Sequence, residues 1–500
     1  MTLPGPSIPA DRLTVRRDLA PAAGECVLYW MTSARRLEWN YALDRALDWA
    51  RALDRPLVVL EALRCDYPWA SARLHRFVLD GMAENAARAA ASGIAYHPYV
   101  EPARGAGGGL LAALAERAAV VVGDDFPAFF LPRMTARAAA IVPCRFETVD
   151  ANGLLPLASS TAAYPTAYAF RRFLQANLKR HLAALPEPAP LAAADLPRGG
   201  RVPEAIQRRW PAASPSLLAG DAAELAALPI DRSVAPVADR RGGAVAARER
   251  LESFVSAGLA RYAEERNHPD ADAGSGLSPY LHFGHLSTHA VLARLAREFH
   301  WSVEDLPERG VGARQGWWRM PPAAESFLDE LVTWRELGYH FCARRPDDHD
   351  AYESLPAWAR ATLEKHAGDP RRSTYDLAEL EGAATHDPLW NAAQRELVTT
   401  GRLHSYLRML WGKKILEWSS DPRSALATMF HLNDKYALDG RDPNSTSGIL
   451  WCLGRFDRPW APERAIFGVV RYLSSDNTAR KLRLKEYLKR HAPGAEGATS

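Results

Sequence analysis

The chain has 500 residues, 47% of them apolar, and its 62 Lys and Arg nearly balance its 59 Asp and Glu. This length exceeds a single ordinary core, so two or more domains are expected, and the even charge excludes a field that attracts a polyanion over the whole surface. Five scattered cysteines without metal-ligand spacing predict no metal site. No apolar run resembles a signal peptide or reaches the length of a membrane span, so we expect a cytoplasmic protein without membrane contact.

Residues 25–180, behind an N-terminal extension of residues 1–24, are predicted to form an α/β domain. Short apolar runs alternate there with helical stretches, at 26–31, 56–62, 94–100, 119–122 and 144–149. This pattern is typical of a doubly wound parallel sheet covered by helices on both faces. Such sheets bind ligands at the carboxyl ends of their strands, but the glycines between 105 and 109 do not form the GxGxxG turn of dinucleotide-binding domains.

Residues 181–246 are predicted to form an interdomain connector. Nine prolines between 185 and 237 interrupt every helical period, and the apolar residues among them suggest that the connector lies along the domain surfaces. From 247 to 491 apolar residues recur at helical spacing, as in Leu403, Tyr406, Leu407 and Leu410. We therefore expect a mostly α-helical second domain, followed by a tail of residues 492–500.

Two motifs in the first part of the helical domain contain residues that could bind a ligand. Residues 275–284 join a glycine turn to Ser278, which can cap a helix, and to Pro279 at the first helical position. Unpaired N–H groups at such a helix start can face a phosphate, although an ordinary capped helix without a ligand fits equally. Glu330 and Trp334 are four residues apart, so one helix face offers an acid and a flat ring; the alternative is a surface charge over a core aromatic residue.

Tryptophans mark the next motif. Trp411 and Trp418 are seven residues apart and fall on nearly one stripe of a helix, about 10 Å apart along its axis. A residue such as Trp390, from a neighbouring helix, would have to continue this row. An ordinary aromatic core stripe would show the same spacing.

The stretch 432–451 is dense in Asn, Asp and Gly, residues that make turns and also hydrogen-bond polar heterocycles. Trp451 ends it, followed by Arg455 and Arg458, an aromatic ring beside positive charge as stacking on exposed bases requires. A plain loop stays possible. The basic stretch 471–491 could contact phosphates, and a solvated helix face is its default interpretation.

Four strings in this order resemble the photolyase and cryptochrome family, most closely its class II branch. They are LSPYLHFG (277–284), HDPLWNAAQ (386–394), LRMLWGKKILEW (407–418) and LNDKYALDGRDPN (432–444). The resemblance extends from Glu25 to Leu488. It implies a carbon–carbon lyase that repairs cyclobutane pyrimidine dimers in DNA by transferring an electron from light-excited reduced FAD to the lesion.

The resemblance implies FAD, active as FADH⁻, folded within the helical domain. The cofactor-binding residues that it implies are Tyr262, Gly276, Leu277, Ser278, Arg335, Arg408, Asn433, Asp439 and Asp442. Asn433 would face flavin N5, where hydrogen bonding favours the reduced forms. The protein then tunes a cofactor that itself supplies the electron chemistry.

The implied substrate is double-stranded DNA whose damaged dinucleotide is flipped out of the duplex. Trp334 and Trp451 would pack against the dimer, and Met409 would lie under it. Glu330, kept protonated by burial, would hydrogen-bond a pyrimidine carbonyl. The arginines expected to contact DNA are Arg441, Arg455 and Arg458.

Trp390, Trp411 and Trp418 match the class II positions through which electrons hop from the surface to an oxidised flavin. By the same resemblance, the N-terminal domain would house an antenna pigment, either a deazaflavin or a folate, and the sequence does not choose between them. A monomer is expected.

Three other functions would share parts of this pattern. A cryptochrome-like photoreceptor would share the fold and flavin but signal without repair; its frequent extended tail is missing, and the expected dimer contacts are present. An enzyme for the (6-4) photoproduct would need two pocket histidines, and His282, His340 and His404 do not match that context. A non-catalytic nucleotide-binding protein would leave the C-terminal strings unexplained.

Overall fold

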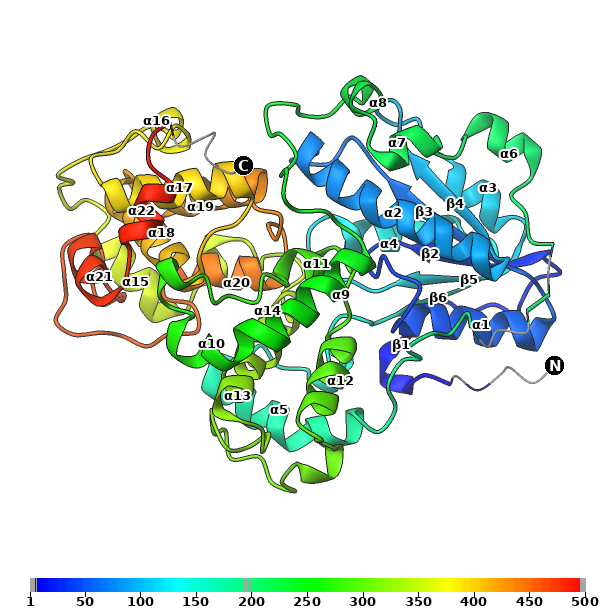
Figure 1. The fold of residues 1–500 in the computed structure, drawn as a ribbon, viewed down its shortest axis with the longest axis horizontal. Helices are drawn as coiled ribbons and strands as arrows, with labels where there is room; N and C mark the ends of the chain where they lie inside the picture. Colours follow the sequence, from blue (N-terminus) through cyan, green and yellow to red (C-terminus); the bar gives the residue numbers. More distant parts are fainter. Residues whose placement is uncertain (1–4, 6, 193–195, 198, 495–500) are drawn as a thin grey trace. The chain divides into compact units, whose positions relative to one another are not determined.

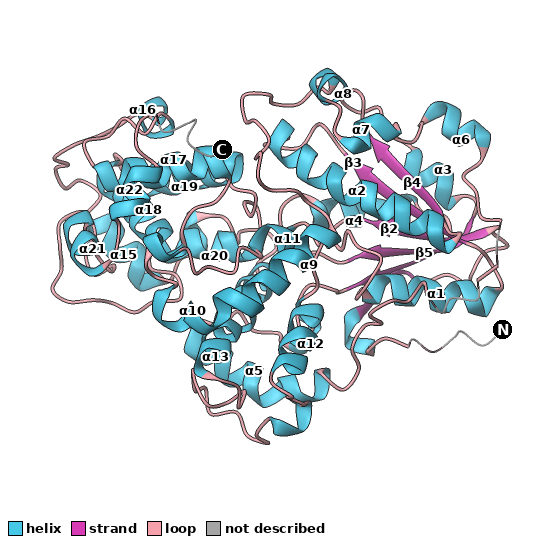
Figure 2. Ribbon diagram, in the orientation of Figure 1, coloured by secondary structure: helices cyan, strands magenta, loops and turns pink. Residues whose placement is uncertain are grey.

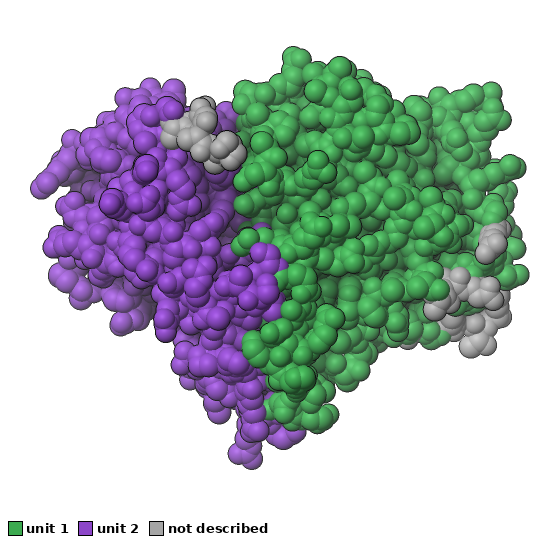
Figure 3. Space-filling view, in the orientation of Figure 1, with its two compact units in different colours: residues 1–161, 177–252, 277–305 green, residues 162–176, 253–276, 306–500 purple. Residues whose placement is uncertain are grey.

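The computed structural model describes residue 5 and residues 7–192, 196–197 and 199–494. The chain divides into two compact units (Figure 3), the first comprising Met1–Thr161, Asn177–Glu252 and Leu277–Asp305, and the second Ala162–Ala176, Ser253–Gly276 and Leu306–Ser500. These divisions differ from the expected domain boundaries at 180 and 247. The chain passes between the units several times, which periodicity along the sequence does not reveal.

A six-stranded sheet forms the centre of the first unit (Figure 2), in the order β1-β6-β5-β2-β3-β4. The strands are β1 (Leu13–Arg17), β2 (Cys26–Met31), β3 (Leu57–Leu63), β4 (Ala95–Val100), β5 (Ala118–Asp124) and β6 (Arg145–Val149). The five predicted strands are confirmed and pair in parallel, whereas β1 pairs antiparallel with β6. The sequence analysis missed β1 because this edge strand is mostly exposed and has no apolar run.

Helices cover both faces of this sheet, as predicted. Val27, Tyr29 and Met31 of β2 belong to one apolar cluster with α1, whereas Leu28 and Trp30 belong to another with α3 and α4. Side chains therefore alternate between two buried faces. The helices up to the connector are η1 (Ala10–Arg12), α1 (Tyr41–Leu53), α2 (Ala72–Ser92), α3 (Leu110–Ala115), α4 (Leu131–Ile141), η2 (Leu157–Ser159) and α5 (Ala167–His181).

A buried charge cluster links α1 to the sheet. Glu147 of β6 is fully buried, and its carboxylate accepts hydrogen bonds from Arg45, Trp49 and Arg145. Burial opposes ionisation of Glu147, but these three donors prevail and lower its pKa.

The described residues of the expected connector belong to the first unit, and they contain three short helices that were not predicted: α6 (Glu204–Arg209), α7 (Pro215–Ala219) and α8 (Ala222–Ala227). Prolines begin helices here: Pro203 is the N-cap of α6, and Pro215 is the first residue of α7. Buried Trp210 donates its indole N–H to the carbonyl of Ala106 at 2.9 Å. The unit also holds α9 (Ala244–Ser253), α11 (Ser278–His282), α12 (Thr288–Glu298) and η5 (Val303–Asp305).

The second unit is helical (Figure 1), and its described residues contain no strand. Its helices include η3 (Phe254–Gly258), α10 (Leu259–Glu265), η4 (Pro269–Ala271), α13 (Pro322–Leu328), η6 (Asp329–Trp334), α14 (Arg335–Arg344), η7 (Tyr352–Ser354), α15 (Ala357–Lys365) and α16 (Leu377–Glu381). The remainder are α17 (Pro388–Thr400), α18 (Ser405–Trp418), α19 (Pro422–Tyr436), α20 (Pro443–Cys452), α21 (Ser475–Lys481) and α22 (Lys485–Arg490). The predicted helical character is confirmed, although η3 and η6 are π-helical turns.

Within the described ranges, no helix is both long and apolar enough to cross a bilayer. In the same part of the chain, no three His, Cys, Asp or Glu side chains gather in a way that could hold a metal ion.

Candidate functional site

Three of the expected cofactor residues meet in one polar cluster between α18, α19 and the segment before α20. Arg408 forms an ion pair with Asp439 at 3.0 Å, and its other nitrogen lies 3.5 Å from the amide oxygen of Asn433. Asn433 is buried and donates its amide N–H to the hydroxyl of Ser445 at 2.9 Å. Sequence reasoning missed Ser445, although it follows the last string by one position. The cluster joins an anion-binding guanidinium to an amide and a carboxylate.

A second cluster joins α14 to the start of α20. The Tyr339 hydroxyl donates to the carboxylate of Asp442 at 2.8 Å, and the Arg335 guanidinium lies 4.2 Å from the centroid of the Tyr339 ring. Burial raises the pKa of Tyr339 well above its usual value. Asp442 also caps α20 by accepting from the backbone N–H of Asn444. Two more of the expected cofactor residues are therefore held together, by a tyrosine that no string identified.

Glu330 differs from its expected state. Its carboxylate lies 2.5 Å from the guanidinium of Arg266, and its side chain is 39% exposed. The burial on which the expected role of Glu330 depended is therefore not present in this structure, and its carboxyl group is engaged by Arg266. Arg266 also lies over the buried ring of Tyr262, at 5.4 Å from its centroid. A spacing of four residues between Tyr262 and Arg266 was the signal that could have revealed this arrangement.

The three side chains expected to touch the dimer, Trp334, Met409 and Trp451, are all partly exposed in the second unit. Trp334 ends the π-helical turn η6, a type of turn that often marks functional sites. Trp451 lies between two cations, with Lys413 at 5.2 Å and Arg471 at 5.7 Å from a ring centroid. Lys413 is fully buried, and desolvation lowers its pKa to about 8.

The three expected relay tryptophans are contiguous. The Trp390 and Trp411 rings stack with their centroids 6.5 Å apart, and the centroids of Trp390 and Trp418 are 5.4 Å apart. Trp390 therefore lies between the two α18 tryptophans and comes from the neighbouring helix α17, as the spacing required. At the Trp418 end of the row, the ring centroids of Tyr375 and His386 lie 5.2 and 5.6 Å from that of Trp418. These two residues are hydrogen-bonded to each other. The structure therefore confirms that the three rings form a contiguous row. Electron transfer along this row stays a prediction.

The glycine turn before α11 lies where the chain passes from one unit to the other. Gly276 belongs to the second unit and has a positive φ of 68°, whereas Leu277 and Ser278 belong to the first. The capping prediction is wrong: Leu277 is the N-cap, no side chain caps α11, and Ser278 is its first residue. Proline therefore occupies the second helical position.

Two of the three arginines expected to contact DNA are buried. Arg441 is 6% exposed, and its guanidinium donates to the carbonyl of Gly440. Arg455 is 7% exposed and donates to the carbonyl of Ser354, and desolvation lowers its pKa to about 10. Both guanidinium groups are therefore engaged within the protein, and a role in DNA contact stays a prediction. Arg458 is exposed.

Part of the basic stretch 471–491 is used within the second unit. Arg490 donates to the carbonyl of Pro269, and Arg483 forms an ion pair with Glu265 at 3.4 Å. Tyr487 is buried beneath this segment. These contacts favour the default interpretation of a structural helix face for these positions.

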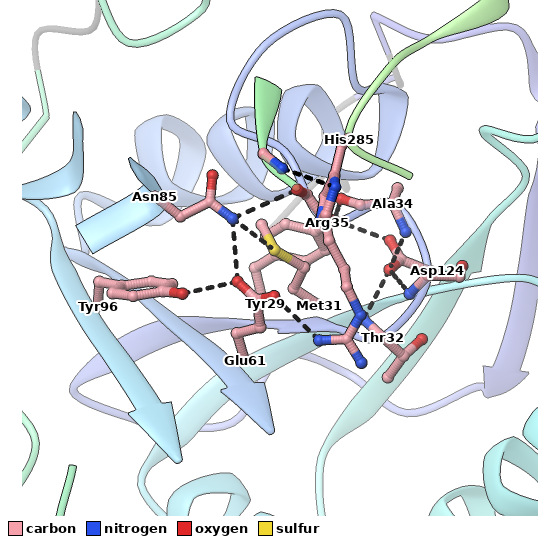
Figure 4. Close-up of polar contacts among 12 residues, drawn as sticks. Tyr29, Met31, Thr32, Ala34, Arg35, Glu61, Asn85, Tyr96, Asp124 and His285 are labelled. Atoms are coloured by element: carbon pink, nitrogen blue, oxygen red, sulfur yellow. Dashed lines mark hydrogen bonds and ion pairs between the residues drawn. The ribbon is translucent and has the colours of Figure 1, made fainter. Parts of the chain in front are cut away.

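The carboxyl edge of the sheet in the first unit carries a buried polar network (Figure 4). Glu61 accepts hydrogen bonds from Arg35, Asn85 and Tyr96. Asp124 accepts three backbone N–H bonds, from residues 32 to 34 after β2. These loop N–H groups, at the place where doubly wound sheets bind ligands, are thus engaged by the protein's own carboxylate.

No protein-family model matches the chain. It is 35% identical over 480 residues to a deoxyribodipyrimidine photo-lyase of Methanothermobacter thermautotrophicus, covering 93% of this chain and 94% of that protein. A protein of the same name from Oryza sativa subsp. japonica is 34% identical over 509 residues, covering 97% of this chain and 92% of the relative. A crystal structure of a class III photolyase from Agrobacterium tumefaciens has the same fold, with a TM-score of 0.68 at 17% identity over 94% of this chain and 87% of that one.

Proposed function

The chain belongs to the photolyase family, and on that premise we propose that it repairs cyclobutane pyrimidine dimers in DNA, using light and bound FAD. We further assign it to the class II branch, on the four strings quoted above. The observation that carries the proposal is the meeting of Arg408, from one string, with Asn433 and Asp439, from another, in one polar cluster. Asn433 is buried and hydrogen-bonded to Ser445, as a buried amide must be to avoid a cost in free energy, and the partly buried Arg408 and Asp439 beside it add a charged donor and a charged acceptor.

The residues of the second unit fit FAD by the chemistry of their donors and acceptors. Arg335 and Arg408 offer guanidinium groups suited to phosphate oxygens, and Asn433 offers both an amide donor and an acceptor suited to a flavin ring. Carboxylates of Asp439 and Asp442 orient the neighbouring donors. Bound FAD in its reduced form would supply, after absorbing light, the electron that breaks the two cyclobutane bonds and is then recovered.

The partly exposed side chains of the second unit would hold the lesion. Enzymes that act on a base take it out of the duplex, and a damaged pair costs less to open. Trp334 and Trp451 would provide flat surfaces for the extruded dimer, with Met409 beneath it. Glu330 would face a pyrimidine carbonyl together with Arg266, whose N–H groups supply donors that the ionised carboxylate lacks.

We also propose that Trp411, Trp390 and Trp418 carry electrons from the surface to the oxidised cofactor. The short separations of their centroids support this order of the three rings. An antenna pigment, a deazaflavin or a folate, is a further proposal for the first unit. Planar side chains gather near its strand ends, where the ring centroid of Tyr67 lies 5.8 Å from that of Phe130 and 6.2 Å from that of Phe129.

One assay separates repair from the alternative of a photoreceptor. Purified protein is chemically reduced, mixed with DNA that contains thymine dimers, and illuminated with blue or near-UV light. Restored thymine absorbance, absent in the dark control, identifies the repair enzyme. Persisting dimers, in a protein whose flavin is still photoreduced, would support a cryptochrome-like photoreceptor instead.

A further inference from the structure

The indole N–H of Trp411 has a single, uncharged partner. It donates to the side-chain oxygen of Gln394 at 2.9 Å, and both residues are almost completely buried, at 2% and 0% exposure. Gln394 is four residues after Trp390 on α17, so one face of this helix contributes both the neighbouring ring and the hydrogen-bond acceptor. The N–H of Trp390, in turn, donates to the backbone carbonyl of Trp411 at 3.1 Å.

Burying the amide of Gln394 at this position costs free energy. Its nitrogen finds no hydrogen-bond partner within the part of the chain that the structure describes, and an unsatisfied buried donor is unfavourable. An apolar side chain would avoid this cost but would leave the indole N–H unpaired. A carboxylate or imidazole would satisfy the N–H, but either group is also a base. Among these choices, only an amide accepts the hydrogen bond without being able to take the proton.

This distinction matters because an indole that has lost an electron becomes a strong acid at its N–H. We propose that Gln394 keeps Trp411 protonated while it is oxidised, so that the positive charge passes to Trp390 and is not trapped by deprotonation. In the proposed relay Trp411 would lose one electron towards the oxidised cofactor and regain one from Trp390, while its N–H proton would stay in place. The inference rests on the relay put forward under Proposed function. Gln394 acts in it as a positioning residue.

The outer end of the row has a different chemical character. Trp418 is next to His386, whose ring nitrogen is hydrogen-bonded to the hydroxyl of Tyr375. Lys414 lies 5.6 Å from the Trp418 ring centroid. Ionisable groups therefore surround the last ring, whereas uncharged oxygens accept the N–H bonds of the two inner rings. Deprotonation is expected only after the charge has reached the outer end.

The test replaces Gln394 by a base of nearly the same shape. In Gln394→Glu, transient absorption of the illuminated, oxidised flavoprotein should show the neutral tryptophan radical at once, and the yield of flavin photoreduction should fall at least fivefold. Lowering the pH until the new carboxyl is protonated should restore the radical cation. Gln394→Leu, which removes the acceptor without adding a base, should retain the radical cation. A long-lived radical cation and undiminished yield in Gln394→Glu at high pH would overturn the inference.

Two measurements on the unmodified protein keep the test decisive if the Glu variant does not fold. The ¹⁵N-labelled indole resonance of Trp411, recorded in the dark, should show a hydrogen-bonded, slowly exchanging N–H, and rapid exchange would contradict the bond. Charge movement along the inner rings should have no solvent deuterium isotope effect. A neutral Trp411 radical from the outset would overturn this inference alone, whereas the absence of any tryptophan radical would overturn the relay as well.

Discussion

Arg266 and Glu330 show how one ion pair changes the chemistry available to a side chain. A carboxylate only accepts hydrogen bonds, whereas the adjacent guanidinium only donates them. With the two groups 2.5 Å apart, the pair places hydrogen-bond donors and acceptors side by side, and of the two only the guanidinium could donate to a carbonyl oxygen. The single buried carboxyl group that the resemblance implied is replaced by a partly exposed pair, whose second member comes from the end of another helix.

Glu330→Ala should lower the repair yield roughly tenfold, because a hydrogen bond to a charged group contributes about 1.5 kcal/mol or more. Flavin content should not change, since Glu330 pairs with Arg266 and not with the Arg408 cluster. Glu264→Ala, an exposed neighbour on α10, is the control and should behave as the unmodified protein. Yield is measured as dimers repaired per absorbed photon, and an unaltered yield in Glu330→Ala would remove this residue from the mechanism.

Trp411→Phe should block photoreduction of the oxidised flavin while sparing repair by protein that has been reduced chemically beforehand. The variant removes the ring that stacks on Trp390, and phenylalanine is much harder to oxidise. Steady illumination followed by absorption spectroscopy measures the first effect, and the dimer assay measures the second. Loss of both activities would refute the assignment of Trp411 to the relay alone.

Helix contacts explain which parts of the site could be predicted. Helical spacing predicted that Trp411 and Trp418 share one stripe of α18, because ring spacing on a helix follows directly from sequence, whereas the place of Trp390 in the row came from the family resemblance. The hydrogen-bond partners could not be predicted from the sequence. Ser445, Tyr339 and Gln394 contact their partners only because of the way in which neighbouring helices pack. The π-helical turn that ends at Trp334 could not be predicted either, because no residue pattern distinguishes i→i+5 from i→i+4 backbone hydrogen bonds.

Gly338→Ala should loosen the packing of α14 on α20. A Cβ added at Gly338 would lie 2.6 Å from the backbone oxygen of Pro443, and such overpacking costs about 1–3 kcal/mol. Melting temperature and flavin retention should both fall, because Tyr339 and Asp442 meet beside this contact. The matched control is Gly448→Ala within α20, where a Cβ would meet nothing within 4 Å. Equal stability of the two variants would contradict this explanation.

The charge cluster of the first unit should make stability depend on pH. The pKa of Glu147 is lowered in the folded state, so its stabilising effect is present above the unfolded-state pKa and is lost as pH falls through the lower, folded-state value. Glu147→Gln should cost about 3–5 kcal/mol near neutral pH, because Arg45 and Arg145 lose their shared carboxylate. Denaturant unfolding at several pH values measures the difference, which should shrink as pH falls through the lowered pKa of Glu147. A constant difference would contradict it.

At the scale of the whole molecule, similarity to photo-lyases covers 93% of the chain and therefore both units. Length indicated two or more domains but no chemistry, and a net charge of +3 says little about a local DNA-binding surface. The alternation of apolar runs was enough to predict the parallel sheet. The exchange of segments between the units was not predictable, since it depends on contacts between residues far apart in sequence.

The central claim is that this chain binds a flavin in its helical unit. The most direct test is to denature the purified protein and identify what it releases by chromatography and absorption. Our account predicts FAD close to one molecule per chain, or its uptake when the cofactor-free protein is reconstituted. A colourless protein that releases no isoalloxazine and takes none up would contradict the account.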